Sequence, residues 1–318
     1  MFEAMLQEQY GLRLLDAQRA QAGAGSDTWF LRCAQGAYVL KFPAAGAIDH
    51  PEAEPALCAF LREHSIPACE FLKNSAGGFL SADSAGRVYT VQRRFPGRTP
   101  DWHSASEPLL LQSAELLGRI HRVLLAYPML PEGIGADFFT HMTPQRALAS
   151  YRRSLETAVR LGDTESAAAL QWRIGLMARF PDWRFDLRRL TLRNTHGDYC
   201  VSQFLCTDDR LTAVIDWTAA CVHPVAWEIL RSFIYGAPCC ASGRIDRALL
   251  SRYLDAYCRY GTLNDYDLSC MERLYLYQIA VCDYYGQYYA SRAQNRAIFL
   301  RQARFATRLL QNAAALAD

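Results

Sequence analysis

The sequence predicts an α+β protein of two lobes, with a small strand-rich lobe over residues 1–95 and a larger helical lobe over residues 96–318. Three observations support this prediction. Short strand-like runs come before residue 95, amphipathic helical patterns dominate after residue 102, and the Pro-Gly pair Pro96-Gly97 marks a hinge at about residues 92–98. We expect the functional site of such a protein to lie in the cleft between its lobes.

The first lobe alternates between helix and strand. Helices are predicted from apolar periodicity, and strands from short apolar runs between Gly-, Ala- and Ser-rich turns. In order, the predicted elements are a helix over Phe2–Tyr10, strands over Leu12–Leu15, Thr28–Cys33 and Tyr38–Phe42, a helix over Pro51–His64 and a strand over Val88–Arg94. Pro51 suits the first turn of the second helix, because proline fixes the backbone angle that a helix needs there.

The second lobe is predicted to be helical with one interruption. The predicted elements are helices over Pro108–Leu125, Pro144–Leu161 and Glu165–Arg179, two strands over Gln203–Cys206 and Leu211–Ile215, and helices again from Pro224 to the end. The two strands lie on either side of an Asp-Asp-Arg turn. They therefore place a short strand pair in the middle of an otherwise helical region.

Composition and charge exclude several classes of protein. The net charge of +2 gives no basic surface for nucleic acid or for an anionic membrane. No apolar run approaches the ~18 residues of a spanning helix, and Met1–Gly11 lacks the apolar stretch of a signal peptide. The eleven cysteines are scattered without a Cys-x-x-Cys pair, which indicates a reducing compartment and no zinc site. We therefore expect a cytoplasmic protein.

The strongest chemical signal lies in two acidic residues near the predicted strand pair. Asp198 follows His196-Gly197, Gln203 comes five residues later, and Asp216 ends an apolar strand. Phosphoryl transfer needs an oxygen base to orient the attacking hydroxyl and oxygen ligands to hold Mg²⁺ against the phosphates. The pattern therefore favours phosphoryl transfer. The alternative is a buried turn before a hairpin, with Asp216 capping the next helix.

The segment from Thr195 to Trp217 resembles the catalytic and metal-binding loops of the aminoglycoside phosphotransferase and choline kinase superfamily, which are relatives of the protein kinases. That family has His-Gly-Asp, an Asn five positions later, and an apolar-Asp-Trp/Phe motif about 18 residues after the first Asp. In this chain 18 residues separate Asp198 from Asp216. The resemblance implies that Asp198 is the catalytic base and Asp216 the main Mg²⁺ ligand. Gln203 replaces the Asn, which puts a second Mg²⁺ in doubt.

The resemblance also implies a bilobal protein-kinase-like fold, with a small antiparallel sheet in the first lobe, that uses ATP or GTP. Lys41 resembles the strand lysine that contacts the nucleotide phosphates. Only Lys41 and Lys73 are lysines among 34 basic residues, so its retention supports a role. Its expected partner is Glu54, which lies 13 residues before Pro67 as in the family, with Glu52 as the alternative.

A stretch of small residues before the second strand is the candidate nucleotide loop. It contains Gly23, Gly25 and Ser26, and small residues let backbone N–H groups approach phosphates closely. A simple hairpin turn explains the stretch nearly as well. A dinucleotide-binding loop is a poorer reading, because the third glycine is missing and a strand follows.

The acceptor is expected to be a hydroxyl group of a small metabolite or antibiotic. From Asn264 to Ala317 the sequence has four acids against six arginines, which argues against a polycation. Six tyrosines surround Asp283, and such a group would hold one ammonium by cation–π contact or stack on a sugar. A tyrosine-rich packing helix is the alternative. The candidate acceptor residues are Asp283, Tyr284 and Glu228, and Glu228 also stands where relatives have a carboxylate that braces the catalytic loop.

Two other functions compete with a small-molecule kinase. The first is a catalytically inactive kinase-like scaffold, of the kind found in spore coats, which retention of Lys41, Asp198 and Asp216 disfavours. The second is a protein kinase, which is disfavoured because His-Gly-Asp stands in place of His-Arg-Asp and no Asp-Phe-Gly occurs.

Overall fold

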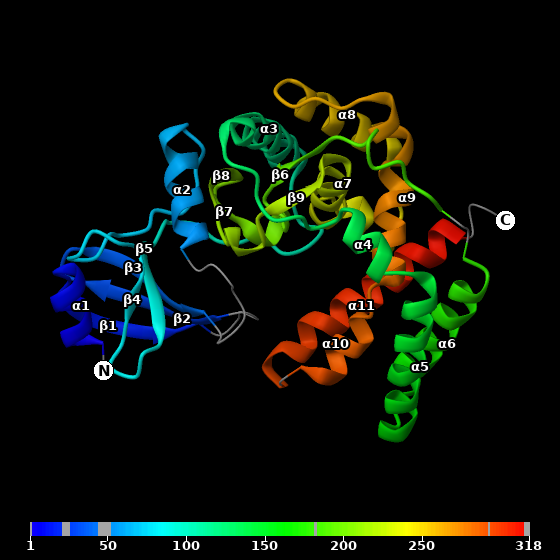
Figure 1. Cartoon of the computed structure of the whole chain (residues 1–318), viewed down its shortest axis with the longest axis horizontal. Helices are drawn as coiled ribbons and strands as arrows, with labels where there is room; N and C mark the ends of the chain where they lie inside the picture. The colour runs from blue at the N-terminus through cyan, green and yellow to red at the C-terminus, as the bar shows by residue number, and fades with distance from the viewer. Residues whose placement is uncertain (1, 21–25, 44–51, 181–182, 292, 315–318) are drawn as a thin grey trace. The chain divides into compact units, whose positions relative to one another are not determined.

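The computed structural model describes residues 2–20, 26–43, 52–180, 183–291 and 293–314 (Figure 1). The chain folds into two compact units. Unit 1 comprises Met1–Pro100 and Ser202–Ala220, and unit 2 comprises Asp101–Val201 and Cys221–Asp318. Among the described helices, none is both long and apolar enough to cross a bilayer.

Unit 1 is built on one antiparallel sheet with the strand order β1-β2-β3-β5-β4. Its strands are β1 (Leu14–Arg19), β2 (Ser26–Cys33), β3 (Gly36–Pro43), β4 (Ser81–Ala82) and β5 (Val88–Arg93), and its helices are α1 (Glu3–Tyr10) and α2 (Ala53–Glu63). Alternation along β3 places Tyr38, Leu40 and Phe42 in the core. The same alternation turns Lys41 to the opposite face of the sheet.

A short hairpin from the middle of the chain completes unit 1. It consists of β7 (Phe204–Thr207) and β8 (Arg210–Val214). Arg98 and Cys206 exchange two backbone hydrogen bonds of 2.9 Å, and the N–H of Val214 donates to Pro67 at 2.7 Å. Gly97 has φ 124°, and a Cβ there would lie 2.9 Å from the carbonyl oxygen of Cys206. Only glycine therefore fits where the predicted hinge segment meets the hairpin.

This division differs from the predicted lobes in one respect. The prediction gave residues 1–95 and 96–318, whereas unit 1 extends to Pro100 and also takes Ser202–Ala220. The reason is long-range backbone pairing, which local sequence patterns do not reveal. The predicted α+β class, with an antiparallel sheet in the first region and helices in the second, is confirmed.

Unit 2 is mostly helical. Its elements are α3 (Glu107–Val123), α4 (Ala136–His141), α5 (Pro144–Leu161), α6 (Thr164–Ala178), β6 (Leu192–Thr195), β9 (Cys221–Pro224), α7 (Val225–Gly236), α8 (Arg247–Cys258), α9 (Asp265–Val281), α10 (Tyr284–Ala290) and α11 (Ala293–Ala314). The helices pack in pairs, α3 with α8, α5 with α6, α7 with α9, and α10 with α11 (Figure 1). Helix α7 is almost wholly buried and forms the centre of the unit.

A buried histidine lies where β9 leads into α7. The side chain of His223 is 7% exposed, and its Nδ1 accepts the backbone N–H of Ile134 at 2.6 Å. Its ring packs on Trp227 with 4.7 Å between ring centroids. Burial lowers the pKa of His223 to about 4. The positive guanidinium of Arg231 lowers the pKa further, and the negative carboxylate of Glu228 raises it by less than these two effects lower it. The imidazole is therefore neutral near pH 7.

This histidine makes the stability of the protein depend on pH. The unfolded chain binds a proton near pH 6.5, whereas the folded chain binds it only near pH 4. The stabilisation is therefore complete above pH 6.5 and is lost as the pH falls, by about 3 kcal/mol between pH 6.5 and 4. His223→Asn keeps an oxygen acceptor for Ile134 but cannot titrate. Urea unfolding across this range should show a shallower decline for the variant, and parallel declines would contradict the prediction.

Candidate active site

In unit 1, the predicted nucleotide lysine meets the predicted metal ligand. The Nζ atom of Lys41 lies 3.2 Å from Oδ1 of Asp216, with side-chain exposures of 17% and 45%. Burial alone lowers the pKa of Lys41, but the carboxylates of Glu54 and Asp216 outweigh burial and raise that pKa above its ordinary value. Lys41 is therefore a permanent positive charge held between two carboxylates.

Glu54 also fixes the backbone around Asp216. It lies in the first turn of α2, and its Oε1 accepts the N–H of Trp217 at 3.0 Å. The indole of Trp217 is 1% exposed and donates to the carbonyl of Val214 at 3.1 Å. The structure thus brings Glu54 to Lys41 and Asp216. The alternative, Glu52, occupies the exposed N-cap position of α2.

The backbone of Asp216 adopts a left-handed conformation, with φ 63° and ψ 64°. This conformation is uncommon for residues other than glycine and persists where surrounding contacts impose it, often at functional sites. The Oδ1 atom also accepts the hydroxyl of Thr218 at 3.0 Å. The contacts of Lys41 and Thr218 orient this carboxylate, and the hydrogen bond from the Trp217 N–H to Glu54 holds the backbone next to it.

The residues present fit a magnesium ion that is shared with phosphates. The backbone carbonyl of Gln203 accepts the N–H of Ile215 at 2.9 Å. Gln203 and Asp216 therefore lie on two chain segments that are hydrogen-bonded to each other. Both side chains offer oxygen, and Mg²⁺ in nucleotide enzymes takes one or two such ligands besides water and phosphate. Within the described ranges, no group of three or more Asp, Glu, His or Cys side chains forms an all-protein cage.

In unit 2, the loop that carries Asp198 is held by a buried carboxylate. Glu228 on α7 is 0% exposed, and its oxygens accept the N–H groups of Gly197 at 2.6 Å and His196 at 3.3 Å. Nε2 of His121 lies 2.8 Å from the same carboxylate. Burial by itself raises the pKa of Glu228, but the hydrogen bond of His121 and the nearby imidazoles lower it below its ordinary value. Glu228 is therefore an ionised brace.

Arg231, which the sequence analysis did not single out, contacts the predicted base. It lies one helical turn after Glu228, and its guanidinium donates to Oδ1 of Asp198. Its side chain is 12% exposed and lies over the rings of Trp227 and Tyr235. Burial disfavours its charge, but the attraction of Asp198 outweighs this and raises the pKa of Arg231 well above its ordinary value. The sequence signal that could have identified Arg231 is that it is a single basic residue in an otherwise apolar run after Glu228.

The candidate acceptor residues all make contacts within the fold or are buried. Asp283 caps α10 by accepting the N–H of Gly286 at 2.7 Å, and it accepts the hydroxyls of Ser150 at 2.6 Å and Ser154 at 2.8 Å. A carboxylate has about four acceptor sites, so little capacity is left for a ligand. Tyr284 is 6% exposed, and Glu228 is fully buried. Their roles in acceptor binding stay predictions, and these contacts favour the alternative of a tyrosine-rich packing helix.

The candidate nucleotide loop is only partly described. Gly23 and Gly25 lie outside the described residues. Ser26 begins strand β2, where its Oγ is 2.8 Å from Oγ1 of Thr28. Its hydroxyl therefore takes part in a contact within the strand, and the role of Ser26 in nucleotide binding stays a prediction.

Comparisons with known proteins agree with this architecture. A model of the phosphotransferase enzyme family matches residues 16–272. Similar solved structures include spectinomycin phosphotransferase APH(9)-Ia with ADP and spectinomycin, at 15% identity over 99% of this chain and 97% of that chain, TM-score 0.66. Amicoumacin kinase hAmiN with AMP-PNP, Ca²⁺ and Ami matches at 14% identity over 96% and 91%, TM-score 0.61.

A third similar structure is aminoglycoside 2'-phosphotransferase-IIIa with GDP, at 14% identity over 96% of this chain and 97% of that chain, TM-score 0.61. A search of curated protein sequences finds no match. At these identities the three structures show a shared fold, which confirms the predicted class.

The pair formed by Arg231 and Asp198 links the predicted base to stability. Asp198→Ala leaves a buried guanidinium without its carboxylate and should lower the free energy of unfolding by about 2 kcal/mol. This is less than for a fully buried pair, because the side chain of Asp198 is 33% exposed. Asp198→Asn keeps an oxygen acceptor and should cost less than Asp198→Ala. Urea unfolding measures both, and unchanged or increased stability of Asp198→Ala would contradict the assignment.

Proposed function

The chain belongs to the phosphotransferase enzyme family and is a phosphotransferase with an alcohol group as acceptor, and we propose that it moves the γ-phosphoryl group of ATP or GTP to a hydroxyl of a small metabolite or antibiotic. The observation that carries this proposal is the meeting of Lys41, Glu54 and Asp216 in unit 1. Lys41 lies on a strand, Glu54 on the next helix, and Asp216 in a loop 175 residues after Lys41. They were predicted as the phosphate contact, its partner and the main Mg²⁺ ligand.

In the proposed mechanism, the charge of Lys41 steadies the nucleotide phosphates, and Glu54 keeps that lysine and the Asp216 loop in place. Asp216 and Gln203 would hold Mg²⁺, which when bound supplies neutralisation of the phosphate charge. The similar structures that contain AMP-PNP, ADP or GDP support a nucleotide, and the Ca²⁺ in one of them supports a divalent cation.

Asp198 is assigned to the acceptor hydroxyl. Its carboxylate would accept or orient the hydroxyl proton as the oxygen attacks phosphorus in line with the leaving nucleotide oxygen. The side chain is 33% exposed, so solvent and solutes reach it. Arg231 and Glu228 act as positioning residues, one through the carboxylate of Asp198 and the other through the peptides before it.

An inactive kinase-like scaffold is the second candidate, and two observations favour it. Arg231 occupies part of the hydrogen-bonding capacity of Asp198, and Gln203 stands where the family has an Asn. Nucleotide binding and turnover separate these candidates.

Nucleotide binding should stabilise the protein only when the metal ligand is intact. Mg-ATP or Mg-GTP at about 100 times its Kd should raise the free energy of unfolding by about 2.7 kcal/mol, seen as a shift of the thermal midpoint. Asp216→Ala should abolish the magnesium-dependent shift. Asp16→Ala removes an exposed carboxylate of the same unit and should keep it. Absence of a shift with either nucleotide would favour the scaffold.

Turnover should depend on Asp198. A screen of hydroxyl-bearing metabolites and antibiotics with the wild-type chain identifies the acceptor by nucleotide consumption. Asp198→Asn should then lower kcat by about 100-fold or more, as expected for loss of a general base, and should retain the nucleotide-dependent thermal shift. Turnover near that of the wild type would exclude Asp198 as the base.

A further inference from the structure

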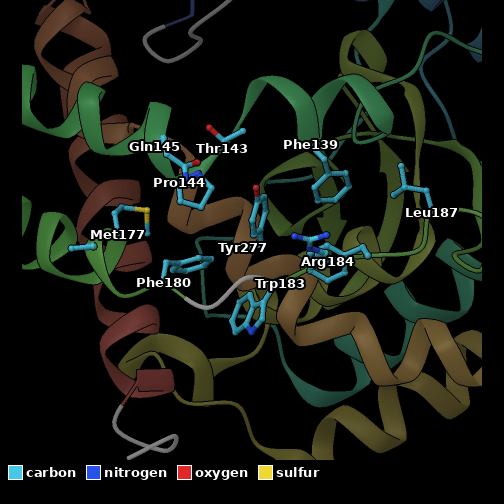
Figure 2. A pocket seen from close by; sticks show the side chains of 12 residues that line it. Phe139, Thr143, Pro144, Gln145, Met177, Phe180, Trp183, Arg184, Leu187 and Tyr277 are labelled. Atoms are coloured by element: carbon cyan, nitrogen blue, oxygen red, sulfur yellow. The ribbon is translucent and has the colours of Figure 1, made fainter.

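Unit 2 buries several tyrosine hydroxyl groups, and the partners of these hydroxyls differ. Tyr277, which lines the cavity shown in Figure 2, donates its hydroxyl to the carbonyl of Met142 at 2.9 Å. Tyr253 on α8 is fully buried, and its hydroxyl donates to Oγ of Ser232 on α7 at 2.8 Å. Tyr257 lies one helical turn after Tyr253. It differs from the other two because its hydroxyl meets a side chain that leads to the loop of the predicted base.

A path of hydrogen bonds connects Tyr257 to that loop. The hydroxyl of Tyr257 lies 2.9 Å from Nδ1 of His121 on α3, and Nε2 of the same imidazole lies 2.8 Å from the carboxylate of Glu228. The carboxylate accepts the N–H of Gly197 at 2.6 Å, and Gly197 directly precedes Asp198. Tyr257 and His121 are both buried, so water does not compete for these contacts.

The two partners of His121 decide which of its ring nitrogens carries the proton. An ionised carboxylate only accepts hydrogen bonds, so Nε2, which faces Glu228, must be the donor. In the neutral imidazole the other nitrogen is an acceptor, and Nδ1 therefore accepts the hydroxyl of Tyr257. Burial raises the pKa of Tyr257 above its ordinary value, so the phenol keeps the proton that it donates.

Loss of this hydroxyl would remove the constraint on the imidazole of His121. In the other tautomer the proton is on Nδ1, and a lone pair of Nε2 faces the carboxylate of Glu228. Two acceptors that face each other repel, so the ring or the carboxylate would have to move. The N–H of Gly197 would then lose its acceptor at the present position, and an unmade hydrogen bond in a buried place is costly.

Two glycines fix the position of Tyr257. A Cβ atom on Gly118 of α3 would clash with the carbonyl oxygen of Tyr257, and a Cβ atom on Gly261 would clash with its ring. The N–H of Gly261 also donates to that carbonyl at 2.9 Å. The close approach of both glycines places the ring of Tyr257 so that its hydroxyl meets His121.

We propose that Tyr257 is a positioning residue for Asp198, because its hydroxyl fixes the imidazole of His121 and thereby orients the carboxylate of Glu228. The proposal rests on the proposed function for the role of Asp198 as the base. The hydrogen-bond path itself belongs to the fold of unit 2 and can be measured without turnover.

Two matched variants test the proposal, since each removes one buried hydroxyl of α8. Tyr257→Phe should speed amide hydrogen exchange at His196 and Gly197 by about tenfold relative to amides at the centre of α7. Tyr253→Phe should leave this ratio within about twofold of the wild type. Near-UV circular dichroism checks that both variants are folded. The same ratio in the two variants would overturn the proposal.

The variant His121→Gln tests the part played by the tautomer. The side-chain amide nitrogen of glutamine always carries hydrogens, so it donates toward Glu228 without a choice of tautomer. In this background Tyr257→Phe should change the exchange ratio by less than about twofold, because the two positions are coupled. An effect as large as in the wild-type background would show that the hydroxyl acts by another route, against the proposal.

Turnover supplies an independent readout once the screen has identified an acceptor. Tyr257→Phe should lower kcat by about tenfold and leave the KM for the nucleotide within about twofold, as expected for a displaced base. Tyr253→Phe should change neither. An unchanged kcat in Tyr257→Phe would contradict the proposal. If exchange responds as expected but no acceptor is turned over, the kinase assignment fails and the positioning path is retained, so the two failures are distinct.

Discussion

The carboxylate of Glu228, buried in the apolar helix α7, is the constraint on which the loop that carries Asp198 depends. A buried charge is tolerated only when it is paired and fully hydrogen-bonded. Glu228 meets this requirement by collecting two loop N–H groups and the imidazole of His121. Those contacts fix the backbone before Asp198, and Arg231 on the same helix then fixes its carboxylate. One helix therefore carries both a negative and a positive group that together position the predicted base.

Much of the fold could be predicted because its signals are local. Helix α5 was predicted as Pro144–Leu161 and has these bounds, since Thr143 caps its first turn and Gly162 adopts the left-handed conformation after its last. Strands β6 and β9 were missed. Each is four residues long, which is too short to show a periodic pattern. They pair Thr195 with Cys221, so no short turn between them indicates a hairpin. The first strand was placed too early, because the half-exposed β1 shows no clear apolar run.

The candidate site divides in the same way. Lys41, Glu54 and Asp216 were singled out because motif and spacing are properties of the sequence. The structure brings the three together, and their roles stay predictions. The partners of a polar residue are not properties of the sequence, so the sequence could not show that the candidate acceptor residue Asp283 already has hydrogen-bond partners within the chain. Asp283 is taken by hydroxyls of α5 more than 120 residues earlier in the chain. Arg231 was not predicted as a site residue, because its contact with Asp198 forms only in the folded chain.

The chain uses arginine almost everywhere but keeps a lysine at position 41, and the surroundings of Lys41 suit a lysine. The ammonium contacts Oδ1 of Asp216 as a single point charge in a side chain that is 17% exposed. A guanidinium is a planar fork that takes both oxygens of a carboxylate at once. At this position a guanidinium would occupy both oxygens of Asp216, the predicted metal ligand. Under the proposed function, lysine would supply a charge for the phosphates and leave an oxygen of Asp216 for a metal, a combination that suits phosphoryl transfer.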